Sequence, residues 1–296
     1  MNTFRIVAAL MSFGRAAEAT HRTQSAISAQ IKALEEEVGA KLFNRHGKGI
    51  SLTPAGETLL AYTRKIIALH EEARSKVSSD PEPACTISIR MPQSLAEHFL
   101  PRIFELHGRR YPRVGFDVSV CASAVLEEEL KTGVTDVAFL LADSVSKAGL
   151  AVHCLGTASL VFVAGAGSQA ASLPIFGWRN LAATRVLVPK HDCAYKMLLE
   201  GALRQRDIRP QALVECNSMC LLRGCVAKQQ GVALVPDFAV EEGVKRGELV
   251  LLPWDGPRFE SGILMIRHEN AWLSEEARYF LELCEQVVGQ WAKDRE

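Results

Sequence analysis

The sequence lacks an uninterrupted apolar segment that could cross a bilayer. A stretch without charged residues, 154–178, has the necessary length, but Gly165, Gly167 and Pro174 interrupt it and only residues 160–164 are continuously apolar. A membrane-spanning helix needs about 20 consecutive and mostly apolar residues. We therefore expect no membrane segment here, and instead a buried strand at 160–164 that is followed by a loop.

The sequence also lacks residues with the spacing of a catalytic or metal site. We place the acidic runs 35–37 and 127–129 on the surfaces of helices. The glycine pattern at 165–170 follows a strand, as in a nicotinamide-dependent enzyme, but Pro174 disrupts the helix that should come next. In addition, no Asp or Glu lies between 168 and 191 to bind a ribose. We therefore expect neither an enzyme nor a bound cofactor or metal.

The cysteines lack the spacing of a zinc ribbon, although the chain has eight of them. In a secreted protein they would be candidates for disulfides, and the apolar run 6–13 followed by the triplet 17–19 is similar to a signal peptide. Arg15, between that run and the triplet, argues against secretion. Because the neighbours of Cys220 and Cys225 are apolar, we expect these two side chains to be buried.

The formal net charge is zero, but the charges are unevenly distributed along the chain. Residues 1–77 hold 11 Lys and Arg against 7 Asp and Glu, an excess of +4, and the remainder has 23 against 27. A basic N-terminal part on an acidic body indicates a polyanionic partner at one end only. At 296 residues the chain is long for one hydrophobic core, so we expect two or three domains.

Apolar residues recur at helical spacing in the N-terminal part. They form two stripes: Phe4, Val7, Ala8 and Met11, followed by Ile27, Ile31 and Leu34. Ser12 is suited to cap a helix that ends near Ala19, and residues 20–23 are expected to form the turn before the next helix.

A basic loop with glycines follows these helices. We expect Leu42 and Phe43 at the end of a helix and the basic loop at 45–49. The segment 50–53 is expected to be a short strand, and Pro54 to begin the next helix with the preceding threonine as its cap. This order of helices, turn and basic hairpin predicts a winged helix-turn-helix.

The N-terminal pattern contains a specific set of residues at fixed spacing. The set consists of Phe4, Val7, Ser12-Phe13 and Ala16-Ala17, then TQSAIS at 23–28, QIKALEEEVGAKLF at 30–43, Arg45 and LTPAG at 52–56. It resembles the LysR-type bacterial transcriptional regulators, and the resemblance extends over the whole chain. It implies that the first apolar run is a core helix of a cytoplasmic DNA-binding domain.

The resemblance also implies which residues contact DNA. In this family the second helix of the motif enters the major groove and the wing contacts the backbone or the minor groove. The matching positions are Thr23, Gln24, Ser25 and Ser28, with Arg45 and Lys48 on the wing, and Arg22 and Lys32 are further candidates because of their charge. The family commonly has an arginine directly after the position of Ser28. Here that residue is Ala29, which removes a guanine or phosphate contact that Arg22 or Lys32 could replace.

A long amphipathic segment follows the wing. It keeps helical spacing through Leu59, Ile66, Leu69 and Ala73. Its apolar face is longer than a small domain can bury, so we expect it to pair with the same helix of a second chain. The expected domains are a winged helix-turn-helix at 1–56, a dimerisation helix at 57–77, a linker at 78–85 and an effector-binding domain at 86–296.

The remainder of the chain has the alternating pattern of an α/β domain. We expect strands at 86–91, 114–121 and 136–142, and helices at 94–112 and 124–133. Alternating elements predict parallel sheets. The resemblance implies two lobes similar to periplasmic binding proteins, with lobe I at 86–163 and 266–296 and lobe II at 164–265.

Polar residues follow several of the expected strands. Ligands of open α/β folds bind at the carboxyl ends of strands, where the N–H groups of helix N-termini favour anions. The candidates are Gln93, Ser94, Ala122, Ser123, Cys193, Asn217 and Ser218. Each alone could be an ordinary helix cap or loop residue. Together they predict a small anionic organic effector in the cleft between the lobes.

Cys193 leaves an alternative open. Its loop resembles that of peroxide-sensing members of the family, and His191 and Lys196 could stabilise a thiolate. In those members a second cysteine follows nine residues later, but the residue here is Ala202. We therefore rank pocket lining first, and a thiol-based oxidant or electrophile sensor of the same architecture second.

The expected partners follow from these assignments. They are double-stranded DNA, a small-molecule effector, further copies of the chain in a homo-tetramer of paired dimers, and RNA polymerase as an additional contact. We expect the protein in the cytoplasm, without a membrane partner.

Overall fold

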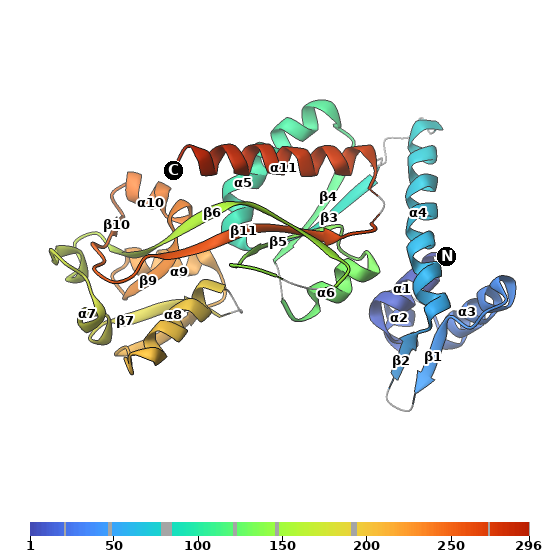
Figure 1. The fold of residues 1–296 in the computed structure, drawn as a ribbon, viewed down its shortest axis with the longest axis horizontal. Helices are drawn as coiled ribbons and strands as arrows, with labels where there is room; N and C mark the ends of the chain where they lie inside the picture. Colours follow the sequence, from blue (N-terminus) through green and yellow to red (C-terminus); the bar gives the residue numbers. More distant parts are fainter. Residues whose placement is uncertain are drawn as a thin grey trace.

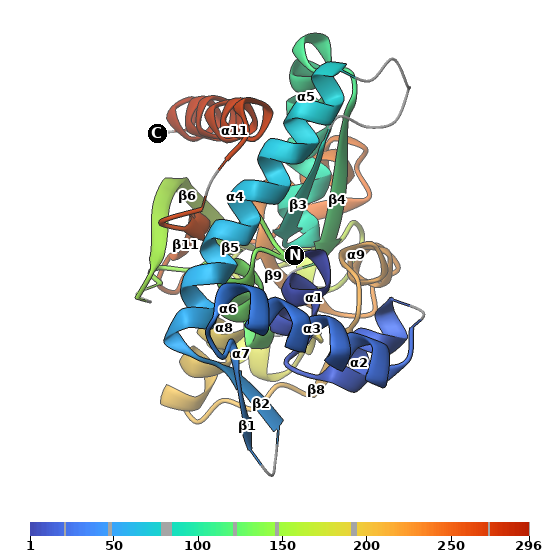
Figure 2. The same ribbon diagram turned by 90° about the vertical axis from the view of Figure 1, so that its right-hand side faces the viewer.

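The computed structural model describes residues 1–20, 22–46, 49–77, 85–120, 123–145, 148–190, 194–271 and 273–295. Figure 1 shows three parts: a helical N-terminal part with a two-stranded hairpin, a long helix α4, and an elongated α/β body. Figure 2, turned by 90°, shows the N-terminal part and α4 in front of the body. Within the described ranges, no helix combines the length and the apolarity that a membrane crossing requires.

The N-terminal part packs three helices and the hairpin around one core. Its elements are α1 Asn2–Leu10, α2 Phe13–Ala19, α3 Gln24–Val38, β1 Phe43–His46 and β2 Gly49–Leu52. The predicted cap at Ser12 is confirmed, because its hydroxyl accepts a hydrogen bond from the Arg15 amide, and Thr23 caps α3 in the same way. The Phe43 ring packs edge-on against Phe4 at 5.5 Å, which fixes the hairpin against α1.

The end of α3 differs from the prediction. Leu42 and Phe43 do not end a helix; α3 stops at Val38, and Phe43 is the first residue of β1. Gly39 adopts the left-handed conformation, with φ 73°, which terminates the helix. Strands β1 and β2 pair antiparallel and form the expected wing.

Helix α4 spans Pro54–Val77 and begins at Pro54, as predicted; it contains the whole segment 57–77 that was assigned to dimerisation. The Thr53 hydroxyl accepts a hydrogen bond from the Gly56 amide at 3.0 Å, which confirms the predicted cap. Tyr62, Ile66 and Leu69, which follow each other at helical spacing, are 57%, 48% and 52% exposed. Large apolar side chains on α4 are therefore about half exposed in the single chain.

The body contains one mixed sheet. Within the described residues it has nine strands: β3 Cys85–Met91, β4 Val114–Val120, β5 Val137–Leu141, β6 Leu150–Gly165, β7 Arg185–Pro189, β8 Ala212–Cys216, β9 Val232–Pro236, β10 Leu249–Leu251 and β11 Phe259–His268. The helices of the body are α5 Gln93–Arg110, α6 Ser123–Thr132, α7 Trp178–Ala182, α8 Ala194–Gln205, α9 Met219–Ala227, α10 Glu241–Lys245 and α11 Glu275–Lys293, with short 3₁₀ turns η1 Ala170–Ser172 and η2 Asp237–Ala239.

The expectation of parallel sheets is right for the two ends of this sheet and wrong for its centre. Strand β3 is parallel to β4 and β5, and β7 is parallel to β8 and β9. Between them, the long strands β6 and β11 run antiparallel to each other and to β9 and β5. Figure 1 shows these two strands crossing the whole body.

The crossing strands define two lobes. We use lobe I for β3–β5 with α5 and α6, and lobe II for β7–β9 with α7–α10. Residues 160–164 of β6 pair with β9 of lobe II, and residues 263–266 of β11 pair with β5 of lobe I. The predicted boundaries at 164 and 266 thus fall near the ends of shared strands, and the division of residues between the lobes stays a prediction.

Candidate functional site

The exposed side of α3 carries most of the residues predicted to contact DNA. Arg22, Thr23, Gln24, Ser25 and Lys32 are exposed, and Ser28 is half-buried. The Thr23 and Ser25 hydroxyls lie 3.0 Å apart. Lys32 forms an exposed ion pair with Glu36, at 3.6 Å. Such exposed pairs are weak, so the Lys32 ammonium is free to exchange this partner for a phosphate.

The wing brings further candidates to the same end of the molecule. Arg45 lies on β1, whereas Lys48 lies outside the described residues. A hollow of about 530 Å³ lies beside α3 and the start of the wing, and it is lined by Ser28, Ala29, Lys32, Glu35, Lys41 and Phe43. Ala29 therefore borders open space on α3.

Glu35 was predicted to be a surface carboxylate, and this is wrong. Its side chain is only 11% exposed. It accepts hydrogen bonds from the Lys41 ammonium at 2.8 Å, the Leu42 amide at 2.9 Å and the Phe43 amide at 3.4 Å. Burial raises the pKa of Glu35, but these hydrogen bonds and the charge of Lys41 outweigh burial and leave the pKa below its usual value. Glu35 thus fixes the first residues of the wing to α3.

The effector candidates lie at the starts of helices. Gln93 and Ser94 begin α5, directly after β3, and Asn217 and Ser218 lie between β8 and α9. Ser123 begins α6, whereas Ala122 and Cys193 lie outside the described residues.

Two of these groups of candidates meet across the lobes. The Gln93 Oε1 atom accepts a hydrogen bond from the Met219 amide at 2.9 Å, so the first turn of α5 in lobe I contacts the first turn of α9 in lobe II. Ser94 is 3% exposed, and Ser218 caps α9 by accepting a hydrogen bond from the Leu221 amide.

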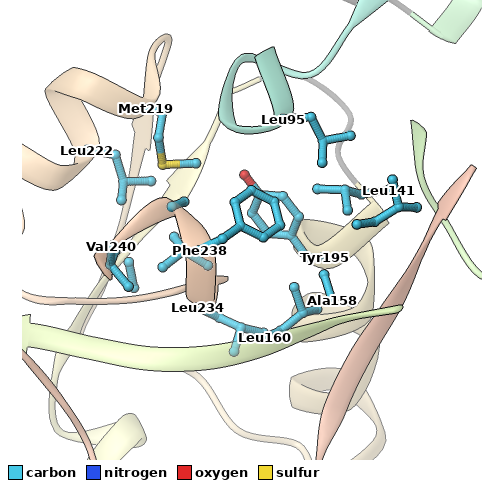
Figure 3. Packing of buried hydrophobic residues seen from close by; sticks show 14 of the residues in the cluster. Leu95, Leu141, Ala158, Leu160, Tyr195, Met219, Leu222, Leu234, Phe238 and Val240 are labelled. Carbon is cyan, nitrogen blue, oxygen red and sulfur yellow. The ribbon is translucent and has the colours of Figure 1, made fainter. Parts of the chain in front are cut away.

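The interior next to this contact is apolar. Figure 3 shows the rings of Tyr195 and Phe238 between Met219 on one side and Leu95 and Leu141 on the other, with the Tyr195 hydroxyl pointing between Leu95 and Met219. All five are buried and belong to one hydrophobic cluster. Tyr195 could not be identified from the sequence, because an aromatic residue near the start of a helix is typical of a core position and carries no separate signal.

The described cysteines and potential ligands support no metal site. Cys220 is exposed and Cys225 half-buried, so the expectation that both are buried is wrong for Cys220 and only partly right for Cys225. On α9 the buried face is formed by Met219, Leu222 and Val226, and position 220 points away from it. Among the described residues, no group of three or more His, Cys, Asp or Glu could hold a metal ion.

The cation proposed to activate Cys193 has other partners. The Lys196 ammonium pairs with Glu215 at 2.8 Å and with Glu200 at 4.0 Å. Cys193 and His191 lie outside the described residues, so the sensor alternative gains no support from this part of the structure.

His98 lies where α5, η2 and α11 meet. Its ring packs against Phe238 at 5.2 Å and Trp291 at 6.0 Å. Burial, together with the charges of Arg295 and Lys245, lowers the pKa of His98 below its usual 6.5, although Asp237 acts in the opposite direction. The neutral ring is therefore favoured at this junction.

The lowered pKa of His98 predicts a pH dependence of stability. The folded protein binds fewer protons here than the unfolded chain, so this contribution is complete above pH 6.5 and is lost as the pH falls through 6.5 towards the lower folded pKa. Thermal unfolding followed between pH 8 and 5 should show a smaller loss of stability for His98→Phe, which keeps a ring, than for the parent protein. Identical pH profiles would contradict the assignment.

Comparisons with known proteins agree with this architecture. The family model for the LysR substrate binding domain matches residues 81–289, and the model for the bacterial regulatory helix-turn-helix protein, lysR family, matches residues 1–57. The HTH-type transcriptional regulator YwqM of Bacillus subtilis (strain 168) is 30% identical over 289 residues, which cover 96% of this chain and 97% of YwqM.

Solved structures share the fold over nearly the whole chain. ArgP from Mycobacterium tuberculosis has a TM-score of 0.68 at 21% identity and covers 97% of both chains. Full-length LysG from Corynebacterium glutamicum with bound effector Arg has a TM-score of 0.66 at 21% identity, covering 98% of this chain and 99% of LysG. The chain therefore belongs to the LysR family: it is a DNA-binding transcriptional regulator with an effector-binding domain, and not an enzyme.

Proposed function

We propose that this regulator binds its operator through α3 and the wing while a small anionic organic molecule in the cleft between the lobes controls the response. The observation that carries the proposal is the contact between Gln93 and the Met219 amide, which brings the starts of α5 and α9 together. Free N–H groups at helix starts favour an anionic group. The adjacent Leu95, Tyr195 and Phe238 would contact the carbon part of such a molecule.

The proposed assembly is a dimer through α4, with two dimers forming a tetramer. The exposed stripe of Tyr62, Ile66 and Leu69 supports the pairing of two α4 helices. Two half-sites at a fixed spacing would then be bound by one dimer. As a regulator of chromosomal DNA, the protein would act in the cytoplasm.

Ser28→Ala and Arg45→Ala should weaken DNA binding in different ways. On a duplex selected from a random pool by the parent protein, Ser28→Ala should reduce discrimination at one base position by about tenfold, with little effect on random DNA. Arg45→Ala should weaken binding to both duplexes alike and lower the salt slope by about one, because a wing cation releases counterions. Fluorescence anisotropy on both duplexes measures this. Equal losses for Ser28→Ala on selected and random DNA would reject a base contact.

A panel of small mono- and dicarboxylic acids, including amino acids, tests the cleft. At least one acid should raise the thermal stability of the parent protein and change its affinity for the selected duplex. Ser94→Ala should reduce both responses and leave the affinity measured without any acid nearly unchanged. Ser274→Ala is the matched control, since Ser274 caps α11 by accepting a hydrogen bond from the Ala277 amide. It should cost about 1 kcal/mol of stability and leave the responses intact. If Ser274→Ala reduced the responses to the acids as much as Ser94→Ala does, the assignment of Ser94 to an effector site in the cleft would be rejected.

A further inference from the structure

Two polar contacts connect α5 of lobe I with α9 of lobe II. The Met219 amide donates to Gln93 Oε1 at 2.9 Å, and the Arg223 Nη2 group donates to Glu97 Oε2 at 2.8 Å. Each contact joins residues that lie 126 positions apart in the sequence. Since the partners lie four residues apart on both helices, the contacts are one helical turn apart and form two rungs between the helices.

The two rungs belong to one network. Gln93 Nε2 donates to Glu97 Oε1 at 2.7 Å, which connects the rungs on α5. On the side of lobe II, Arg223 Nη1 donates to the Ala239 carbonyl at 2.8 Å, which ties the guanidinium to η2. The Arg223 and Glu97 side chains are 32% and 37% exposed. The second rung is therefore accessible to water and can break at moderate cost.

The rungs are separate from the strands that join the lobes covalently. Strands β6 and β11 carry the chain between the lobes, so the contacts between α5 and α9 can open without breaking the sheet. Arg295, which follows α11, pairs with Asp237 at 2.6 Å and with Glu241, and so makes another link to lobe II. Helix α11 packs against α5 of lobe I. The ion pairs of Arg295 therefore join the two lobes at the same junction as the rungs.

We propose that the Gln93–Met219 and Glu97–Arg223 contacts form a latch that holds the two lobes together while the cleft contains no effector. An effector with a hydrogen-bond acceptor at the start of α9 would compete with Gln93 for the Met219 amide, and loss of that rung would weaken its neighbour through Glu97. The competition with an effector rests on the proposed function. The part of the proposal that says these contacts help to hold the lobes together does not depend on the proposed function, because it is argued from the observed distances.

Hydrogen exchange of the Met219 amide in the full-length protein, without DNA or any added acid, tests the latch. Glu97→Arg removes the second rung on α5, together with the acceptor for Gln93 Nε2. Arg223→Glu removes the same rung on α9, together with the bond to the Ala239 carbonyl. Each should speed exchange of this amide by about threefold or more, because opening of the remaining rung becomes easier. The double variant Glu97→Arg with Arg223→Glu restores opposite charges and should return the rate to within about twofold of the parent.

Arg102→Glu is the matched control. Arg102 pairs with Glu105 at 2.6 Å within α5, on an exposed part of lobe I, and its replacement should leave the exchange rate of the Met219 amide unchanged. Arg223→Met removes the rung without reversing a charge, and it should also speed exchange. This variant keeps the test usable where a charge reversal impairs folding. Unchanged exchange in Arg223→Met, or no recovery in the double variant, would overturn the latch.

These measurements distinguish the latch from the proposed function. If exchange follows the predicted pattern but no carboxylic acid affects the protein, the latch stands and the proposed effector class is wrong. If acids act on the protein through Ser94 but exchange is the same in all variants, the effector site stands and the latch is overturned.

Discussion

A Leu69→Glu protein is expected to lose the pairing of its α4 helices, to have a lower mass than the parent, and to bind the selected duplex at least about 100-fold more weakly. The loss of affinity is expected because two half-site contacts that are linked in one dimer strengthen overall binding by about this factor or more. Leu69 is 52% exposed in the single chain, so a glutamate there should hardly affect its folding. In a pair of α4 helices the same carboxylate would be buried in an apolar seam, which costs several kcal/mol. Sedimentation gives the mass, and anisotropy gives the affinity.

Leu251→Glu is the matched control for this substitution. Leu251 is 50% exposed and lies at the end of β10, in lobe II. The exposed fraction and the chemical change are therefore nearly the same, but α4 is not involved. This control should keep the parent mass and affinity. A folded Leu69→Glu protein with the parent mass would contradict dimerisation through α4.

Replacing Glu35 with alanine is expected to weaken DNA binding by about tenfold, although the substitution removes a negative charge from the DNA-binding part. Electrostatics alone would predict tighter binding to the phosphate backbone. The loss is expected because the amides of Leu42 and Phe43 lose their acceptor, which costs roughly 1–3 kcal/mol, and the start of the wing is then no longer fixed to α3. Anisotropy at several salt concentrations measures the effect.

Two further variants separate position from charge. Glu35→Gln keeps an oxygen that can accept from the amides and should retain most of the affinity. Glu36→Ala removes an exposed carboxylate that pairs only at 3.6 Å with Lys32, so it should bind DNA as tightly as the parent or more tightly. If Glu35→Ala also bound as tightly as the parent, Glu35 would have no role in positioning the wing.

Features encoded by neighbouring residues could be predicted from the sequence. Ser12 and Thr53 cap their helices as expected, because a cap depends on residues two or three positions away. The buried positions of Val7 and Ile27 follow from helical spacing in the same way. Local signals were thus sufficient to predict the winged helix-turn-helix.

Features that depend on distant pairings could not be predicted in this way. Strand β6 starts at Leu150, ten residues before the expected apolar segment, because its first half is completed by β11 from the other end of the chain. The contact between Gln93 and Met219 joins helices 126 residues apart. The burial of Glu35 likewise depends on the wing folding back onto α3. None of these partners leaves a periodic signal in the sequence.

Footprinting of the parent protein on the selected duplex during titration with the carboxylic acid panel tests the central claim most directly. The claim is that an anionic molecule in the cleft changes how the regulator binds DNA, because a ligand that contacts both lobes favours one arrangement of them. We predict that at least one acid shifts the protected region in the parent protein, and that Ser94→Ala weakens this shift. A footprint that stays the same with every acid, on protein that binds the duplex specifically, would contradict the account.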